Sequence, residues 1–260
     1  MLSTQREVSR LLTAERHRLI MDLLSQKEVV KLQSIVQKTD SSESTIRRDL
    51  ALLEEQGLLK RIHGGATLPY SKFDEPNMQE KVSKNSDEKR VIAQLAASLI
   101  RDGDCIYLDA GTTVAEMLPF LVDKKIVIVT NGLMHIELLT AANITTYLLG
   151  GRIKANTKAI VGSVAQDNLR KYRFDKCFLG MNGVDLELGF TTPDPEEGVL
   201  KQIAIELAEE AFVLADESKF TETFFSKVCD VDHATIITDK MDEELLKKFR
   251  QKTDMKVVKS

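Results

Sequence analysis

Apolar residues recur every three or four positions through the first 70 residues, which is the spacing of helices that bury one face. Behind residues 13–16, which can cap a helix, the first apolar stripe consists of Leu19, Ile20, Leu23 and Leu24. A short β-branched run at 29–32 predicts a brief extended segment. Residues 32–38, with Ile35 and Val36 apolar, fit a second short helix. We therefore expect two short helices before residue 40.

A third helix is expected after a tight turn at 39–41. Ser42 is a good N-cap residue, because its hydroxyl can accept from a backbone N–H of the first turn. Ile46, Leu50 and Leu53 form one narrow apolar stripe, and Gly57 ends the helix as a C′ glycine does. The residues on its sides and back are Ser44, Thr45, Arg47 and Arg48. Hydroxyls and guanidinium groups suit DNA phosphates and guanine edges, although an ordinary surface helix with solvated arginines has the same pattern.

The residues that follow favour the DNA-binding interpretation. Two short strands around Gly64-Gly65 predict a β-hairpin within 58–68. Three helices and a hairpin make a winged helix-turn-helix domain, which we place at residues 13–68. The hairpin tip would carry three groups toward the phosphates, namely Lys60, Arg61 and His63.

The rest of the chain predicts a second domain of another class. Residues 69–85 are polar and contain two prolines, which predicts a linker. From 86 to 260, strand-like and helix-like segments alternate, as in an α/β domain with a mostly parallel sheet. The expected strands are 105–108, 126–129, 145–149, 176–179, 212–215 and 234–237, and the expected helices are 87–100, 112–121, 133–140, 196–209 and 242–252.

Small and polar residues follow five of the expected strands. These turns are 109–113, 130–132, 150–152, 180–185 and 216–219. In parallel sheets, ligands bind at the carboxyl ends of the strands. Gly111, Thr112 and Thr113 open a helix whose backbone N–H groups can bind an anion. One such turn is weak evidence, because turns generally favour these residues; five at one edge favour a polyhydroxylated, phosphorylated ligand.

The charge balance alone does not indicate nucleic-acid binding. Residues 1–70 contain 11 Lys and Arg against 9 Asp and Glu, and the remaining residues contain 25 against 31, so the halves carry +2 and −6. DNA binding is therefore inferred from where the basic residues of the third helix and the hairpin stand. An acidic second domain would keep DNA on the first.

The cysteines and histidines do not suggest a metal site or a disulfide framework. Cys105, Cys177 and Cys229 are widely spaced, which indicates reduced thiols in a cytosolic protein, and the four histidines show no ligand spacing. No apolar run approaches the roughly 18 residues of a membrane span, and the first dozen residues lack the apolar core of a secretory signal. We expect a cytoplasmic protein that has no metal, cofactor or membrane partner.

Two sets of motifs resemble the DeoR family of bacterial repressors, and together they cover nearly the whole chain from Thr13. Residues 44–50, 53–54, 57–58 and 61–66 resemble its DNA-binding signature, and residues 109–113, 130–132, 150–151, 182–185, 191–197 and 215–220 resemble its sensor domain. Residues 30–33 and 189–197 are similar to the fructose-operon repressors of Gram-positive bacteria. That similarity implies fructose 1-phosphate as the effector.

The sensor domain of this family is similar to ribose-5-phosphate isomerase. The similarity implies that the hydroxyl residues after the first strand and Lys219 hold a sugar phosphate, and that Asp185 matches an acidic residue of the isomerase site. Asn182 stands where the isomerase has a catalytic aspartate, and an amide cannot act as a general base near neutral pH. The resemblance therefore implies a sugar-phosphate pocket without catalysis.

We expect the effector phosphate on the N–H groups of Gly111, Thr112 and Thr113, with Lys219 as the counter-charge. The residues expected to reach sugar hydroxyls or a second anionic group are Asn131, Asp185 and Lys201.

Three functions remain open at this stage. The first, which we expect, is a repressor of a sugar-utilisation operon that a sugar phosphate releases from its double-stranded operator. The second is a sugar-phosphate isomerase with a DNA-binding appendage, and the third is a DNA-binding protein whose second domain only oligomerises. Because two-fold dimers of such domains read paired half-sites, we expect a homodimer or homotetramer.

Overall fold

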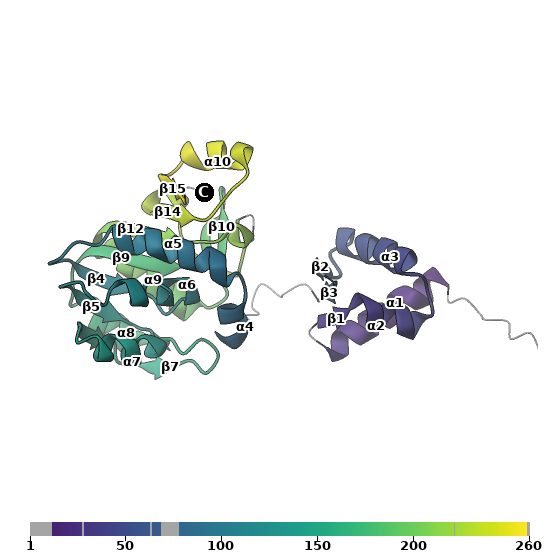
Figure 1. Ribbon diagram of the computed structural model, residues 1–260, viewed down its shortest axis with the longest axis horizontal. Helices are drawn as coiled ribbons and strands as arrows, with labels where there is room; N and C mark the ends of the chain where they lie inside the picture. The colour runs from purple at the N-terminus through teal and green to yellow at the C-terminus, as the bar shows by residue number, and fades with distance from the viewer. Residues whose placement is uncertain (1–11, 28, 63, 69–77, 221, 259–260) are drawn as a thin grey trace, which may run out of the picture. The chain divides into compact units, whose positions relative to one another are not determined.

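The computed structural model describes residues 12–27, 29–62, 64–68, 78–220 and 222–258 (Figure 1). The chain divides into two compact units, 1–71 and 72–260. His63, which the sequence places at the hairpin tip, lies outside the described residues, as does the 69–77 part of the expected linker. In the described part of the chain, the helices are too short or too polar to cross a membrane.

The N-terminal unit buries the apolar stripes that the sequence contains. Its elements are α1 (Thr13–Gln26), β1 (Val29–Lys31), α2 (Leu32–Thr39), α3 (Glu43–Glu55), β2 (Lys60–Ile62) and β3 (Gly65–Thr67). Ile20 of α1, Ile35 of α2 and Ile46 of α3 are completely buried in one core. Leu50 and Leu53 join them, which confirms the predicted stripe of the third helix.

The predicted hairpin is present and gains a third strand. β3 pairs antiparallel with β2 on one side and with β1 on the other, so the order is β1-β3-β2. Gly65, at the start of β3, lies directly against β1: a Cβ there would stand 2.2 Å from the carbonyl oxygen of Val30. Only glycine allows this approach, since so short a contact would force the strands apart.

Helix α3 begins and ends at the residues that the sequence predicts. The Ser42 hydroxyl accepts from the backbone N–H of Thr45 at 3.2 Å. At the other end, Gly57 has φ +69°, and its N–H and that of Leu58 donate to the carbonyls of Glu54 and Leu53. This pair of bonds is the Schellman ending that a C′ glycine permits.

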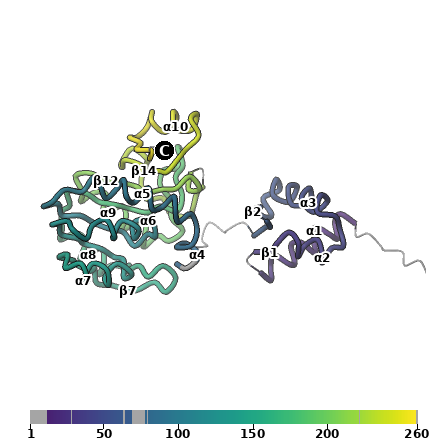
Figure 2. The backbone as a smooth tube through the Cα atoms, in the orientation of Figure 1, coloured from purple at the N-terminus to yellow at the C-terminus, as the bar shows by residue number. Residues whose placement is uncertain are grey.

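The second unit contains a seven-stranded sheet in the order β15-β14-β12-β9-β4-β5-β6, and all its pairings are parallel (Figure 2). Its elements are α4 (Met78–Ser83), α5 (Ser86–Ser98), β4 (Cys105–Leu108), α6 (Thr112–Ala115), η1 (Leu118–Phe120), β5 (Val127–Thr130), η2 (Leu133–His135), α7 (Ile136–Ala141), β6 (Thr145–Leu148), β7 (Arg152–Ile153), β8 (Ile160–Val161), α8 (Ser163–Leu169), β9 (Phe174–Gly180), β10 (Gly183–Asp185), β11 (Gly189–Thr192), α9 (Pro195–Glu206), β12 (Ala208–Leu214), η3 (Glu217–Lys219), β13 (Ser226–Cys229), η4 (Val231–His233), β14 (Thr235–Thr238), α10 (Glu243–Arg250) and β15 (Met255–Val257). The predicted α/β class with a parallel sheet is confirmed.

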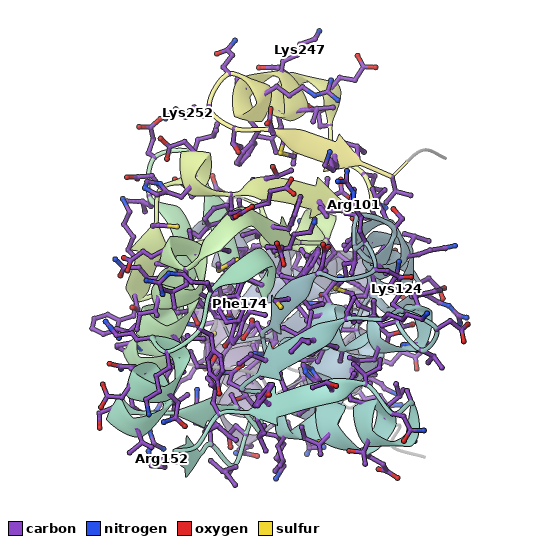
Figure 3. The ribbon with its side chains drawn as sticks, turned by 90° about the vertical axis from the view of Figure 1, so that its left-hand side faces the viewer. Arg101, Lys124, Arg152, Phe174, Lys247 and Lys252 are labelled. Carbon is purple, nitrogen blue, oxygen red and sulfur yellow. The ribbon has the colours of Figure 1, made fainter. Side chains whose placement is uncertain are left out.

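Helices cover both faces of this sheet. Apolar residues of α5, α6 and α7 form one core, and those of α8, α9 and α10 form another. Figure 3 shows Phe174 of β9 inside the unit, with Lys247 of α10 at its opposite margin from Arg152 of β7. β4 and β9 are neighbours in the sheet. After β4 the chain forms β5 and β6 toward one edge, and after β9 it forms β12, β14 and β15 toward the other. Ligands of open α/β sheets bind at the carboxyl ends of such a pair.

Several predicted boundaries differ from the observed ones for identifiable reasons. The helix expected at 112–121 stops at Ala115, because Pro119 lacks an N–H and its ring would meet the carbonyl of Ala115. The helix expected at 196–209 ends at Glu206, because Ala208 already pairs with Phe174 in the sheet. The helix expected at 133–140 is split into η2 and α7.

Two features were not expected from the sequence. Part of the predicted linker, 69–85, is the helix α4. A small antiparallel sheet, β10-β11-β13, extends the unit beyond the parallel sheet.

Candidate functional sites

The start of α3 carries three hydroxyl residues that hold one another. The Oγ of Ser42 lies 2.9 Å from the Oγ of Ser44 and 2.8 Å from the Oγ1 of Thr45. Ser42 and Ser44 are exposed and Thr45 is half-buried. The hydroxyls can therefore meet a ligand at this helix end, but they exchange hydrogen bonds within the cap as the structure stands.

The basic residues of the DNA-binding unit differ in how they are held. Arg47 pairs with Glu43 one turn earlier at 2.6 Å, and Arg61 of β2 pairs with Glu54 of α3 at 2.5 Å. Arg48 is exposed and has no ion pair among the described residues. Lys60, at the start of β2, is also exposed. The guanidinium group of Arg48 can therefore contact a base without first breaking an ion pair, whereas that of Arg47 is paired with Glu43.

A buried ion pair fixes α3 against α1. The carboxylate of Asp49 is only 3 % exposed; it accepts from the Nε of Arg16 at 2.7 Å and from its Nη2 at 3.0 Å, and it lies 3.2 Å from the Nε2 of His17. Burial alone would raise the pKa of Asp49, but the hydrogen bonds from Arg16 and His17 outweigh it and hold the pKa below its ordinary value. Sequence reasoning missed this role, because Asp49 and Arg16 are 33 residues apart.

In the second unit, the ends of β4 and β9 are in direct contact. The backbone N–H of Gly180 donates to the Oδ2 of Asp109 at 3.0 Å, and a Cβ on Gly111 would stand 3.3 Å from the Cα of Gly180. Lys201 of α9 forms an ion pair with the same carboxylate and donates to the carbonyl of Gly180 at 2.9 Å. Lys201 is 5 % exposed, so its ammonium ties the strand ends together and does not project toward a sugar.

Two other residues expected at the sugar also make internal contacts. The side-chain amide of Asn131 accepts from the N–H of Ala110 at 3.0 Å and donates to the carbonyl of Ile160 at 3.2 Å, and the residue is 2 % exposed. The carboxylate of Asp185 accepts from the N–H groups of Glu187 and Leu188 in the turn after β10. Both side chains stabilise loops of the candidate site.

The first turn of α6 leaves backbone donors available. Among the described hydrogen bonds, none is donated by the N–H groups of Gly111, Thr112 or Thr113. Gly111 and Thr112 are half-buried and Thr113 is 7 % exposed. These three N–H groups at the carboxyl edge of the sheet are therefore available to an anion, and the anion site at this turn stays a prediction.

Lysines converge beside this turn. Lys89 of α5 lies within electrostatic range of Lys219 of η3 and of Lys81 in α4, and Lys219 lies within range of Lys81 and Lys84. Burial lowers the pKa of Lys89 to about 8, and the charge of Lys219 adds to that effect. Burial also lowers the pKa of Lys219, with Lys84 and Lys81 acting in the same direction. Glu116, which follows the last residue of α6, also acts on the charge of Lys89, so Lys89 lies near α6.

Asp216 is the carboxylate at the centre of the lysine cluster. Its Oδ1 accepts from the Nδ2 of Asn85 at 2.9 Å and from the N–H of Ser218 at 3.0 Å. Its Oδ2 is buried without a hydrogen-bond partner in the described structure. Burial would raise the pKa of Asp216, but Lys219 and the hydrogen bonds keep it lowered. Sequence reasoning found Lys219 but missed Lys81, Lys84 and Lys89, because it placed two of them in a linker.

A cavity lies away from these residues. A cavity of about 600 Å³ is lined by the amino ends of β12 and β14 and by residues 250–254. It is at the opposite edge of the sheet from Asp109 and Asp216, since these follow the carboxyl ends of their strands. In the described part of the chain, His, Cys, Asp and Glu form no cluster that could hold a metal ion.

Comparison with known proteins yields matches along most of the chain. A model of the DeoR-like helix-turn-helix domain matches residues 16–72, and a model of the DeoR C-terminal sensor domain matches residues 84–240. The regulator FruR of Bacillus subtilis, described as an uncharacterized HTH-type transcriptional regulator, is 53% identical over 96% of this chain and 100% of its own length. The lactose phosphotransferase system repressor of Staphylococcus epidermidis is 36% identical over 88% of this chain and 93% of its own length.

Solved structures resemble the chain more distantly. Ribose 5-phosphate isomerase A of Methanocaldococcus jannaschii is 21% identical, with a TM-score of 0.40 over 53% of this chain and 56% of that one.

Proposed function

Since the chain belongs to the DeoR family of transcriptional regulators, we propose that it represses a sugar-utilisation operon and that a sugar phosphate releases it from DNA. Several relatives are themselves named as repressors, including the lactose phosphotransferase system repressor. We further propose fructose 1-phosphate as the effector and a homo-oligomer as the active form. The relative that bears the name FruR and the sequence motifs at 30–33 and 189–197 support the choice of sugar.

The observation that carries this proposal is the gathering of lysines at the carboxyl edge of the sheet. Two of them, Lys89 and Lys219, have lowered pKa values, because burial and neighbouring ammonium groups disfavour their charge. A bound dianionic phosphate would favour the charged form of both lysines, because its two negative charges offset the repulsion between the ammonium groups. The site therefore favours a phosphorylated ligand over a neutral sugar.

In the proposed complex, the phosphate sits on the N–H groups of Gly111, Thr112 and Thr113, and the long side chain of Lys219 supplies the counter-charge. Because β9 lies between β4 and β12, the two strand ends are roughly 10 Å apart. One phosphorylated hexose can span that separation, with its phosphate on the donors and its hydroxyls toward Asp216. The buried Oδ2 of Asp216 offers a sugar hydroxyl an acceptor that no described residue occupies.

In the proposed complex with DNA, α3 lies in the major groove. Arg48, exposed on α3, reads a base, while Arg47 and the basic residues of the hairpin contact phosphates. The ion pairs support these different roles. Arg47 and Arg61 each have a carboxylate partner, whereas Arg48 has none among the described residues and can turn toward a base.

A thermal-shift panel of sugar phosphates tests the proposed effector, because a ligand of the folded state raises the melting temperature by mass action. We expect fructose 1-phosphate to give the largest shift, and the same compound to release operator DNA in an electrophoretic assay. Fructose and inorganic phosphate serve as controls. A stronger shift by another sugar phosphate would refute the choice of sugar, and no shift by any would refute the sensor.

Isomerase activity is the weaker proposal. Asn182 carries an amide where a base is needed, and its Oδ1 already accepts from the hydroxyl of Thr192 at 3.1 Å. We expect no turnover of pentose or hexose phosphates; measurable turnover that Asn182→Ala abolishes would contradict this.

A further inference from the structure

The last strand of the parallel sheet leaves one side of its backbone uncovered. β6 pairs with β5 on one side and, among the described residues, has no strand on the other. The N–H of Leu149 donates to the carbonyl of Thr130, so odd-numbered residues of this segment face β5. Because directions alternate along a strand, Thr146 and Leu148 direct their N–H and C=O groups outward.

Large apolar side chains surround this open edge. They are Tyr147 (49 % exposed) and Leu148 (40 %) of β6, Leu133 (37 %) and Met134 (57 %) of η2, Ile153 (52 %) of β7 and Val164 (55 %) of α8. Thr130, which precedes η2, pairs with Leu148, and a Cβ on Gly150, just after β6, would stand 3.6 Å from a methyl of Val164. β6 itself contains no charged residue. Exposed edges of soluble proteins are often protected by charged side chains, and β6 has none.

We propose that this edge, defined as β6 with Leu133, Met134, Ile153 and Val164, is where a second copy of the chain binds. The backbone of β6 can pair with the β6 of a second copy. When the two strands run antiparallel about a two-fold axis, the outward N–H groups of Thr146 and Leu148 lie opposite the outward carbonyl groups of the other copy. The two sheets then continue as one across the axis, with Tyr147 next to it. A two-fold dimer also supplies the paired DNA-binding units that an operator with two half-sites requires.

The amount of apolar surface fits a stable dimer. The six side chains together expose on the order of 400–500 Å² per protomer. A standard interface buries about 800 Å² per partner, of which about 450–500 Å² is apolar. The edge therefore has the apolar area of a complete interface. It lies at the opposite end of the parallel sheet from β15 and α10, on the side where Figure 3 labels Arg152.

Sedimentation of the full-length chain with one charged substitution tests the interface. Leu148→Glu places two like charges across the axis, and we expect it to raise the dimer dissociation constant by about 100-fold. The matched control is Leu188→Glu, at a side chain that is 51 % exposed in the β10–β11 turn. Both variants should keep the thermal shift given by the effector, which separates loss of the dimer from loss of the fold or of the sensor.

A cross-link gives an independent measurement. In a Cys105→Ser background, which removes the exposed thiol, Tyr147→Cys should form a disulfide between two copies under mild oxidation, because residues at a two-fold axis between antiparallel strands are close enough for that bond. Leu188→Cys should not. A monomeric parent chain, a Leu148→Glu variant that dimerises like the parent, or equal cross-linking at both positions would each overturn the proposal.

Discussion

Asp49→Asn is expected to weaken the DNA-binding unit from its interior. Asp49 is 3 % exposed and takes two hydrogen bonds from an Arg16 side chain that is itself only 12 % exposed. Removing one partner of a buried pair costs about 3–5 kcal/mol, because the other charge stays buried. Asparagine keeps one acceptor oxygen, and we therefore expect a loss of about 2–3 kcal/mol.

The exposed pair between Glu43 and Arg47 provides the control on the same helix. Its side chains are 56 % and 65 % exposed, so Glu43→Gln should cost no more than about 0.5–1 kcal/mol. Hydrogen exchange of the full-length chain measures both, since opening of α3 exposes its amides. Asp49→Asn should speed their exchange about 30- to 150-fold. An effect of Asp49→Asn no larger than that of Glu43→Gln would refute the argument.

The pH dependence of the same variant has a defined sign. The folded pKa of Asp49 is held below its ordinary value of 3.8, so its contribution is fully present above that pH. It is lost as the pH falls through the lowered folded value, because the carboxyl is then protonated in both states. The parent and Asp49→Asn should therefore differ at pH 7 and converge in acid well below pH 3.8. A difference that persists unchanged into strong acid would contradict the assignment.

Four further substitutions test the remaining sites. Arg48→Ala should cost about 1–3 kcal/mol on the operator and less on random DNA, while Lys60→Ala should weaken both alike and lower the salt slope by about one unit; equal losses for Arg48→Ala on both DNAs would exclude base reading. Gly65→Ala should lower the melting temperature of the DNA-binding unit, since the added Cβ meets the Val30 carbonyl at 2.2 Å, and an unchanged melting temperature would contradict that contact. Lys219→Ala should keep operator binding but need at least ten times more sugar phosphate for release; release at the parent's concentration would place the site elsewhere.

The sequence predicted best where a local pattern sets the structure. Ser42, the stripe from Ile46 to Leu53 and Gly57 define α3 by contacts within one helix and its core, and each stands as predicted. The alternation of apolar strands and helices likewise gave the parallel sheet. The predicted helix ends were wrong where a residue distant in sequence determines them. Ala208, for example, was expected in a helix but lies in β12, because it pairs with Phe174 in the sheet.

The candidate effector site shows the same limit in its chemistry. Gly111, Thr112 and Thr113 could be found from one turn, because a strand end followed by a helix start is a local signal. The roles of Lys201 and Asn131 could not, since a carboxylate 92 residues away and a carbonyl 29 residues away use their polar atoms. The lysines of α4 were hidden for the opposite reason: a short helix with few apolar residues looks like a linker.

The position of α4 gives the proposed effector a means to act on DNA binding. An effector changes operator affinity only as far as it binds the DNA-free and DNA-bound arrangements differently, and a coupling of about 1–3 kcal/mol corresponds to roughly 5- to 150-fold. α4 is the first described element after residues 69–77, which lead to it from the DNA-binding unit. Lys89 donates to the carbonyl of Lys81 at its end, and the N–H of Met78 donates to the carbonyl of Asn156 at its start. In the proposed complex, the phosphate therefore lies beside Lys81 and Lys89, which belong to the first two helices after residues 69–77. Lys219 is in the same proposed site but on η3, so we expect Lys219→Ala to weaken effector binding while operator binding is kept.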